Sequence, residues 1–385
     1  MTKTIWKKDY LFAILVLLCM HTGPYLLLSV ITVYGKMLTG SDTLAGMMAS
    51  VFALSGLFAR FLSAFLLDRY PVKKVLLFFT AVMAAASGLY IFTSAYIQAF
   101  ILRGIQGLAY GVTCTAMSTY IVRLLDPQDR LEGIGYSSLT ANLANAFGPA
   151  AAYMLLGKNV DQFQVLFTAV FISVIVSFVL MFFLKDTGEV PAEKKGKSEK
   201  NSLAVLLIPF LIWVFMSFSM SSVSAFLSLS AIEKGFSGIG LYFTFNVIGL
   251  VFSRFTMKRI LSLTGETTMV TLMIILISLS LAGIGLVTEV WQLYCIAPLF
   301  GFANGCLAPL INTGMVNSLP DHKSGFANAV FFAAGDGGFI IGPTFWGMIA
   351  GISGYTSVFL MAALLCAGAA LLYHFVYRKK GAANE

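Results

Sequence analysis

Charged residues are scarce in this chain. Asp, Glu, Lys and Arg make up 11% of the 385 residues and hydrophobic residues 58%, whereas a soluble domain carries about 25% charged residues. A soluble protein of this length could not bury so much apolar surface. The composition therefore excludes an ordinary soluble domain and predicts a protein surrounded by lipid.

Motifs for covalent chemistry, nucleotide hydrolysis and metal binding are also absent. The sequence has no CxxC pair, no GxxxxGK[ST] phosphate loop and no evident Ser/His/Asp or Cys/His nucleophile set. Its five cysteines fall inside apolar runs, where they act as small packing residues. We therefore expect no disulfide, no metal site and no cofactor, and a protein that is neither an enzyme nor driven directly by ATP.

Long polar stretches are missing except for residues 185–201, which are rich in Lys, Glu and Gly and typical of a solvated linker. The rest of the chain consists of apolar runs long enough to cross a bilayer as helices. We predict twelve spans, at 11–34, 43–67, 73–96, 98–122, 133–156, 162–184, 203–232, 237–257, 267–288, 290–317, 325–350 and 354–377. The first run is too long for the core of a signal peptide and is kept as a span.

Lys and Arg concentrate on one side of these spans. With the N-terminus inside, nineteen of them fall in inner segments, whereas the outer loops hold only Lys36, Lys158 and Lys234. This bias predicts that both termini are cytoplasmic. It also accounts for the net charge of +8, so we expect no nucleic-acid partner.

The chain repeats itself at an offset of 194 residues. The segment 58–61 (FARF) returns as 252–255 (FSRF), Gly107 and Gly111 return as Gly301 and Gly305, and Gly148-Pro149 returns as Gly342-Pro343. Two similar halves in one orientation indicate a tandem duplication, a plan found in transporters that move one half against the other. We predict an N-terminal half at 1–184, the linker at 185–201 and a C-terminal half at 202–385.

The loop between the second and third spans carries a charged motif. Residues 64–74 read AFLLDRYPVKK, in which Asp68, Arg69 and Lys73 match the pattern G-x-L-a-D-R-x-G-R-K, with Ala64 and Pro71 in place of its two glycines. The chain thereby resembles the major facilitator superfamily, and within it the bacterial twelve-helix, proton-coupled efflux branch. The resemblance implies that Asp68 latches the halves at the start of helix eleven, near residue 325. The alternative for these charges is an ordinary positive-inside loop.

Two further segments carry the same resemblance. Residues 103–111 (RGIQGLAYG) are similar to the family pattern R-x-x-Q-G, which implies that Arg103 serves in proton coupling or in recognition of substrate charge. The alternative for Arg103 is a side chain that snorkels to the outer interface. Gly135 and Gly148-Pro149 match part of the pattern typical of exporters, with alanines at its other glycine positions.

The resemblance implies an all-α membrane fold of twelve transmembrane helices in two six-helix halves, related by a pseudo-twofold axis along the membrane normal. It also implies a multi-pass protein of the bacterial inner membrane that acts as a monomer. We expect its partners to be a small-molecule substrate, protons and the lipid bilayer.

Few charges fall inside the spans. They include Arg60, Arg103, Arg254 and one acid, Asp336, with His21 midway along the first span beside Gly23-Pro24. We hypothesise an Arg60–Asp336 pair between the halves that protonation of Asp336 breaks; the alternative is a static structural pair. Arg254 either snorkels inward or pairs with Glu132. His21 is either a neutral hydrogen-bonded side chain or a proton or substrate site.

Three intramembrane arginines against one acid favour an anionic or zwitterionic substrate. Candidate side chains for the substrate cavity, each with a helix–helix hydrogen bond as its alternative role, are His21, Tyr25, Gln106, Tyr110, Asn142, Asn145, Asn246, Asn304 and Asn312. The predicted function is a secondary active transporter that exports a small organic compound in exchange for protons. The alternatives are an importer or anion exchanger of the same fold, a non-transporting receptor, and a membrane enzyme.

Overall fold

Helices make up nearly all of the structure, a computed structural model. It describes residues 7–126, 129–157, 162–186, 200–319 and 324–381, although not the side chains of 130–132, 135, 138, 142, 146, 200–204, 324–325 and 376–381. No strand occurs in these described ranges. Continuous apolar runs favour helices because a helix satisfies all of its own backbone N–H and C=O groups without water. The predicted all-α class is confirmed.

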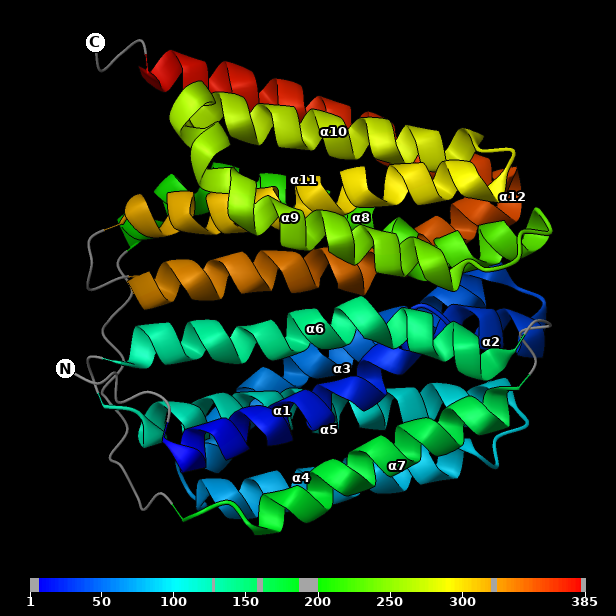
Figure 1. Cartoon of the computed structure of the whole chain (residues 1–385), viewed down its shortest axis with the longest axis vertical. Coiled ribbons are helices and arrows are strands. Elements are labelled where there is room, and N and C mark those ends of the chain that lie inside the picture. Colours follow the sequence, from blue (N-terminus) through cyan, green and yellow to red (C-terminus); the bar gives the residue numbers. More distant parts are fainter. Residues whose placement is uncertain (1–6, 127–128, 158–161, 187–199, 320–323, 382–385) are drawn as a thin grey trace. The chain divides into compact units, whose positions relative to one another are not determined.

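The chain order of the helices follows the predicted runs (Figure 1). The helices are α1 (Lys8–Leu27), α2 (Ile31–Thr39), α3 (Asp42–Leu67), α4 (Val72–Tyr90), α5 (Tyr96–Leu124), α6 (Arg130–Leu156), α7 (Phe163–Phe182), α8 (Lys200–Glu233), α9 (Gly240–Thr264), α10 (Glu266–Leu286), α11 (Val290–Asn317) and α12 (Ser324–Gly381). α12 contains two helices, because Gly354 between them has a left-handed φ of 77° that other residues rarely adopt.

Eight segments within the described residues are long and apolar enough to cross a membrane. One of them joins α1 and α2, and another joins the two parts of α12. The remaining long helices, α5, α6 and α9, fall outside this set and include polar residues such as Arg103, Asn145 and Arg254. The pattern is consistent with the predicted count of twelve spans.

Two helix ends differ from the predicted runs. The first predicted span, 11–34, is not one continuous helix, because α1 passes through Gly23-Pro24 to Leu27 and short turns replace the helix at residues 28–30. Pro24 lacks only one N–H, which an otherwise intact helix tolerates. The eighth predicted span ends at residue 257, whereas α9 continues through Lys258 and Arg259 to Thr264.

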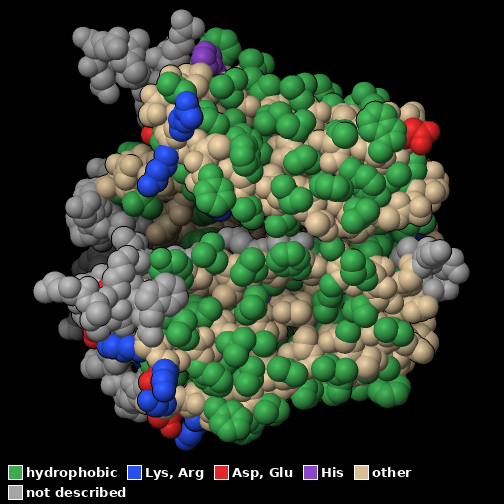
Figure 2. All heavy atoms as spheres, in the orientation of Figure 1, with side chains coloured by type: hydrophobic (Ala, Val, Ile, Leu, Met, Phe, Trp, Pro, Cys, Tyr) green, Lys and Arg blue, Asp and Glu red, His purple; other side chains and the backbone are tan. Residues whose placement is uncertain are grey.

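The helices form two compact units. Unit 1 comprises Met1–Gly40 and Val51–Lys195, and unit 2 comprises Ser41–Ser50 and Gly196–Glu385. Figure 2 shows that hydrophobic side chains cover most of the visible face of each unit, while the visible Lys and Arg gather toward one end of its helices. This pattern is typical of a helical membrane protein. The predicted domain boundaries and the predicted orientation of the termini remain predictions.

The 194-residue repeat returns as repeated close packing. In unit 1, a Cβ on Gly107 would overlap α3 at Phe52 and Ser55, and in unit 2 a Cβ on Gly301 would overlap the Asn246 carbonyl of α9. Asn246 is the counterpart of Phe52 at the same offset. Glycine at these positions lets two helix backbones approach closely, so each unit repeats the same helix pair.

α5 of unit 1 and its counterpart α11 of unit 2 begin with the same pattern of hydrogen bonds. In unit 1, Gln98 Oε1 accepts hydrogen bonds from the N–H groups of Ser94 and Ala95, at 3.3 and 3.4 Å. In unit 2, its counterpart Gln292 accepts from Thr288 and Glu289, at 2.8 and 3.2 Å. These bonds satisfy backbone donors at the starts of α5 and α11. The duplication therefore preserved helix ends as well as close contacts.

Candidate functional site

Arg103 is the most unusual side chain of unit 1. It lies in the second turn of α5 with only 1% of its surface exposed. One guanidinium nitrogen (Nη1) donates to Gln106 Oε1 at 2.6 Å, while the Nε group has no hydrogen-bond partner. No ion pair to Arg103 occurs among the described residues. The guanidinium therefore faces the interior of unit 1, away from the outer interface.

Neighbouring helices hold Arg103 through uncharged groups. Gln106, one turn along α5, donates through Nε2 to Ser87 Oγ of α4 at 3.0 Å, and Ser87 donates to the Met83 carbonyl at 2.8 Å. The guanidinium carbon lies 4.0 Å from the centre of the Phe52 ring of α3. A cation over an aromatic face is attracted by the ring quadrupole. These contacts orient the charge and leave it uncompensated.

A second group of rings adjoins this charge. Phe52 stacks on Tyr110 of α5 with ring centres 5.6 Å apart, and the Tyr110 hydroxyl lies 2.7 Å from His21 Nδ1 of α1. Tyr25, one turn further along α1, packs edge-on against His21 at 6.0 Å. Aromatic contacts and one hydrogen bond thus link the Arg103 charge to a buried imidazole.

We call these seven side chains the polar cluster. Its members, from α1, α3, α4 and α5 of unit 1, are His21, Tyr25, Phe52, Ser87, Arg103, Gln106 and Tyr110. The structure brings together four predicted cavity residues and Arg103. The prediction missed Phe52 and Ser87, because a Phe or Ser in an apolar span carries no individual signal. Comparison of the repeats draws attention to both positions, because the residues at the 194-residue offset are of a different type: Asn246 for Phe52 and Leu281 for Ser87.

The predicted asparagines are not part of this cluster. Asn246 donates to the Ala297 carbonyl at 3.4 Å and so links α9 to α11, which is the structural alternative stated for it. Asn145 is exposed, and Asn304 and Asn312 are half-buried in α11. The Asn312 Oδ1 atom is buried without a hydrogen-bond partner. The side chain of Asn142 lies outside the described residues.

The predicted gating residues fall in both units. Asp68 and Arg69 lie in the turn after α3, where the Arg69 guanidinium carbon is 3.9 Å from the centre of the Phe65 ring. Pro71, with φ of −55°, precedes α4 and forms the turn where the family pattern has glycine. Arg60 is exposed in unit 1 and Asp336 is half-buried in unit 2. The latch and the Arg60–Asp336 pair therefore stay predictions.

Titratable and sulfur groups form no metal centre in the described part of the chain, which holds no group of three His, Cys, Asp or Glu side chains with suitable geometry. All five cysteines are free thiols. A cavity of about 260 Å³ opens in unit 2, and none of the predicted site residues lines it. The polar cluster is therefore the strongest candidate for the functional site.

Known proteins resemble the chain along its length. The family model described as Major Facilitator Superfamily matches residues 13–339 and 214–385. The staphylopine export protein of Staphylococcus aureus (strain Mu50 / ATCC 700699) is 23% identical over 347 residues, which cover 86% of each chain. A multi-drug resistance efflux pump PmrA homolog of Lactococcus lactis subsp. lactis (strain IL1403) is 30% identical over 175 residues, 43% of each chain.

Solved structures match the fold. A POT family transporter crystallised with a thioalcohol-conjugated peptide superposes with a TM-score of 0.80, at 12% identity and with 96% of each chain covered. A bacterial homolog of the human lysosomal transporter Spinster gives a TM-score of 0.79 at 12% identity, with 98% of each chain covered. At these identities the likeness establishes the architecture alone.

Proposed function

Because this chain belongs to the Major Facilitator Superfamily, we propose that it is a proton-coupled exporter of a small organic anion or zwitterion. It works by alternating access as a monomer in the bacterial cytoplasmic membrane, with both termini in the cytoplasm. Its work is transport across a membrane without covalent chemistry.

The observation that carries the anionic substrate is the uncompensated charge of Arg103. A cation in the hydrocarbon region costs several kcal/mol unless it faces a partner or a cavity. Arg103 is buried, its Nε group has no hydrogen-bond partner, and its known contacts are an amide oxygen and an aromatic face. A carboxylate of the substrate supplies the missing charge and accepts guanidinium N–H groups with matched geometry.

The coupling acid in this proposal is Asp336. It is the only Asp or Glu within any of the twelve predicted spans. Protonation from one side of the membrane neutralises it, and release to the other side restores the charge. An acid that changes its charge in a low-dielectric region changes the free energy of the conformations unequally, which is what coupling requires.

Two relatives support export as the direction. The names of both, a staphylopine export protein and a multi-drug resistance efflux pump homolog, denote outward transport. The first covers 86% of this chain. Import or anion exchange remains the second candidate, because a buried arginine suits an anion moving in either direction.

Comparison of metabolites in a deletion strain and its parent tests both substrate and direction. We expect one organic acid or zwitterion to accumulate inside the deletion strain and to decline in its medium. Accumulation of a compound outside the deletion strain indicates import. A cationic compound that accumulates inside contradicts the role of Arg103.

Purified protein in liposomes then tests the coupling. We expect the compound to move against its gradient when a pH gradient is imposed, and Asp336→Asn to abolish this accumulation while leaving exchange of the compound down its gradient. Unchanged proton-driven accumulation in Asp336→Asn removes Asp336 from the coupling role.

A further inference from the structure

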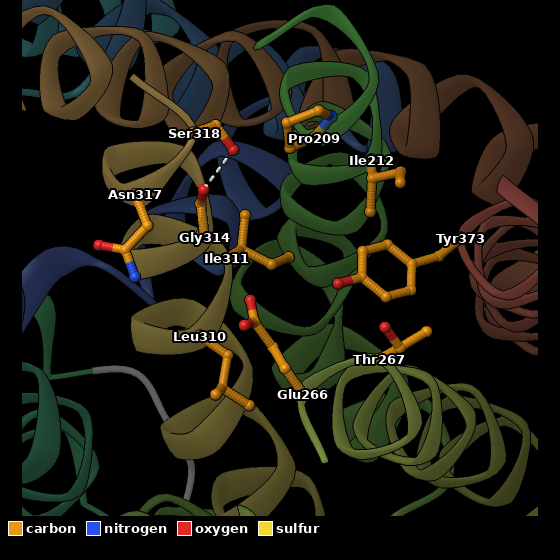
Figure 3. Close-up of a pocket in the computed structure, with 10 residues that line it drawn as sticks. All are labelled: Pro209, Ile212, Glu266, Thr267, Leu310, Ile311, Gly314, Asn317, Ser318 and Tyr373. Carbon is orange, nitrogen blue, oxygen red and sulfur yellow. Dashed lines mark hydrogen bonds between the residues drawn. The ribbon is translucent and has the colours of Figure 1, made fainter. Parts of the chain in front are cut away.

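Unit 2 contains a cavity that is separate from the polar cluster of unit 1. It has a volume of about 260 Å³ and lies among the beginnings of α8 and α10 and the final turns of α11 and α12. In the predicted orientation this is the cytoplasmic end of the unit. Figure 3 shows the Glu266 carboxyl group directed toward Gly314 and Ile311, with the Tyr373 ring on the opposite side.

The residues that line this cavity in unit 2 can be compared with the residues at the equivalent positions of unit 1. The counterparts of Glu266, Ile311 and Gly314 in unit 1 are Val72, Met117 and Tyr120. These three side chains are fully buried core residues, exposed by 2%, 0% and 1%. At these three positions unit 1 has packed core side chains, whereas unit 2 has residues that line a cavity.

Of these three positions, Gly314 differs most in side-chain size from its counterpart, Tyr120. A glycine in place of a tyrosine removes a whole aromatic side chain, and tightly packed interiors leave few spaces of that size unfilled. A Cβ on Gly314 would lie 3.0 Å from Glu266 Oε1. The carboxylate thus reaches into the region that an aromatic side chain occupies in the other unit.

The lining of the cavity combines one charge with apolar walls. Among the described residues that line it, Glu266 is the only charged one. Leu310 and Ile311 supply apolar surface, and Thr267 and Asn317 supply polar groups. Glu266 also lies in the first turn of α10, where an acid favours the helix dipole. The dipole explains an acid at this position but explains neither the cavity nor the direction of the carboxylate.

We propose that this cavity is a second binding site that takes a small organic cation, a protonated amine on a compact apolar body. The ammonium group pairs with Glu266 and the apolar body contacts Leu310, Ile311 and the ring of Tyr373. A pocket that combines apolar walls with a small number of placed polar groups is the usual form of a small-molecule site. The site is separate from the polar cluster and does not depend on the transport proposal.

Binding of benzylammonium to the purified full-length protein in detergent tests this site. We expect millimolar benzylammonium to raise the thermal unfolding midpoint in a concentration-dependent way, because a ligand that binds only the folded state stabilises it. Benzyl alcohol and benzoate, which lack the positive charge, have at least tenfold weaker effects. Equal stabilisation by all three compounds, or none by benzylammonium, overturns the proposal.

Matched variants locate the binding. Glu266→Gln and Gly314→Tyr, which restores the residue of unit 1, each weaken benzylammonium binding at least tenfold by calorimetry. Glu289→Gln removes another exposed acid, from the start of α11, and leaves the affinity unchanged. If Gly314→Tyr does not fold, Glu266→Val, again the residue of unit 1, replaces it. Parental affinity in Glu266→Gln overturns the proposal.

Discussion

The two units share a scaffold and differ in their buried chemistry. At the 194-residue offset, four of the seven polar-cluster residues have apolar counterparts in unit 2: His21, Ser87, Arg103 and Gln106 correspond to Phe215, Leu281, Ala297 and Phe300. The counterparts of the other three, Tyr25, Phe52 and Tyr110, are Ser219, Asn246 and Asn304. The positions that allow close helix contact are the same in both, as Gly107 and Gly301 illustrate. The cation and the network that holds it therefore belong to unit 1 alone.

This difference separates two kinds of constraint. A close backbone approach tolerates few residues besides glycine, so drift after duplication is limited there. A buried polar side chain costs free energy unless it is hydrogen-bonded, so a polar residue in one unit is readily an apolar residue at the equivalent position of the other. By the same reasoning, the cavity beside Glu266 marks chemistry that only unit 2 carries.

Arg103→Ala, which installs the residue of unit 2, is expected to have the largest effect. Hydrogen bonds to a charged group contribute about 1.5–3 kcal/mol, so we expect transport efficiency for the exported compound to fall at least about tenfold. Uptake into inside-out vesicles measures it. Arg254→Ala, which removes an exposed arginine of α9, serves as the control and should retain transport. Parental transport by Arg103→Ala means that the difference between Arg103 in unit 1 and Ala297 in unit 2 does not matter for transport.

Gly301→Ala and Gly107→Ala test the feature that the units share. Each added methyl group meets the backbone of a neighbouring helix, and overpacking of this kind costs about 1–3 kcal/mol. We expect both variants to lower the thermal unfolding midpoint in detergent. Gly351→Ala, whose Cβ meets nothing within 4 Å, should not. A loss in only one unit shows that the repeated contacts are not equivalent.

His21→Phe and Tyr110→Phe test whether the hydrogen bond between these two residues of the polar cluster contributes to transport. Each removes the 2.7 Å hydrogen bond between the two side chains, which contributes about 1 kcal/mol and hence a roughly fivefold change in transport efficiency. The double variant should lose no more than either single one, because both break the same bond. Additive losses indicate that the residues act separately.

The smallest expected effect on stability comes from two hydrogen bonds, in which a different side chain in each unit donates to the equivalent backbone carbonyl group. Tyr34 donates to the Thr93 carbonyl at 3.0 Å in unit 1, and Lys234 donates to the counterpart carbonyl of Val287 at 2.9 Å in unit 2. We expect Tyr34→Phe and Lys234→Met to lower the free energy of unfolding by about 1 kcal/mol each. Chemical denaturation in detergent measures both. An unchanged free energy of unfolding in Lys234→Met would show that the hydrogen bond from Lys234 to the Val287 carbonyl does not stabilise the protein.

Lys234 also predicts a pH dependence. Partial burial lowers the pKa of its ammonium group below the ordinary value of 10.5, against a smaller opposite effect of Glu233. The unfolded chain then binds more protons than the folded one just below pH 10.5, so this group's contribution to stability rises as the pH increases through that window. The rise should be small, since the group is largely solvated, and absent in Lys234→Met.

Much of the fold was predictable from the sequence. The apolar run at 290–317 coincides with α11, and the boundary between the last two runs coincides with the left-handed Gly354. The end of α9 was not predictable, because Lys258 and Arg259 suit a loop and an exposed helical turn equally well. The break at 28–30 also escaped prediction, since no residue there forbids a helix.

The candidate site was predictable only in part. His21, Gln106 and Arg103 attract attention as polar groups in an apolar environment, where each needs a partner. Which partner each of them finds depends on how the helices are rotated against one another. Spans that are apolar on every face carry no periodicity from which that rotation can be read.

The sequence by itself determined the membrane class, the duplication and the identity of the buried cation, because scarce charge, repeated glycines and an arginine within a span are local facts. Only the tertiary structure decided that Phe52 and Ser87 complete the cluster around Arg103. It alone decided that Gly314 lines a cavity whereas its counterpart Tyr120 is packed in the core. Both depend on side chains from separate helices meeting in space, and packing decides that.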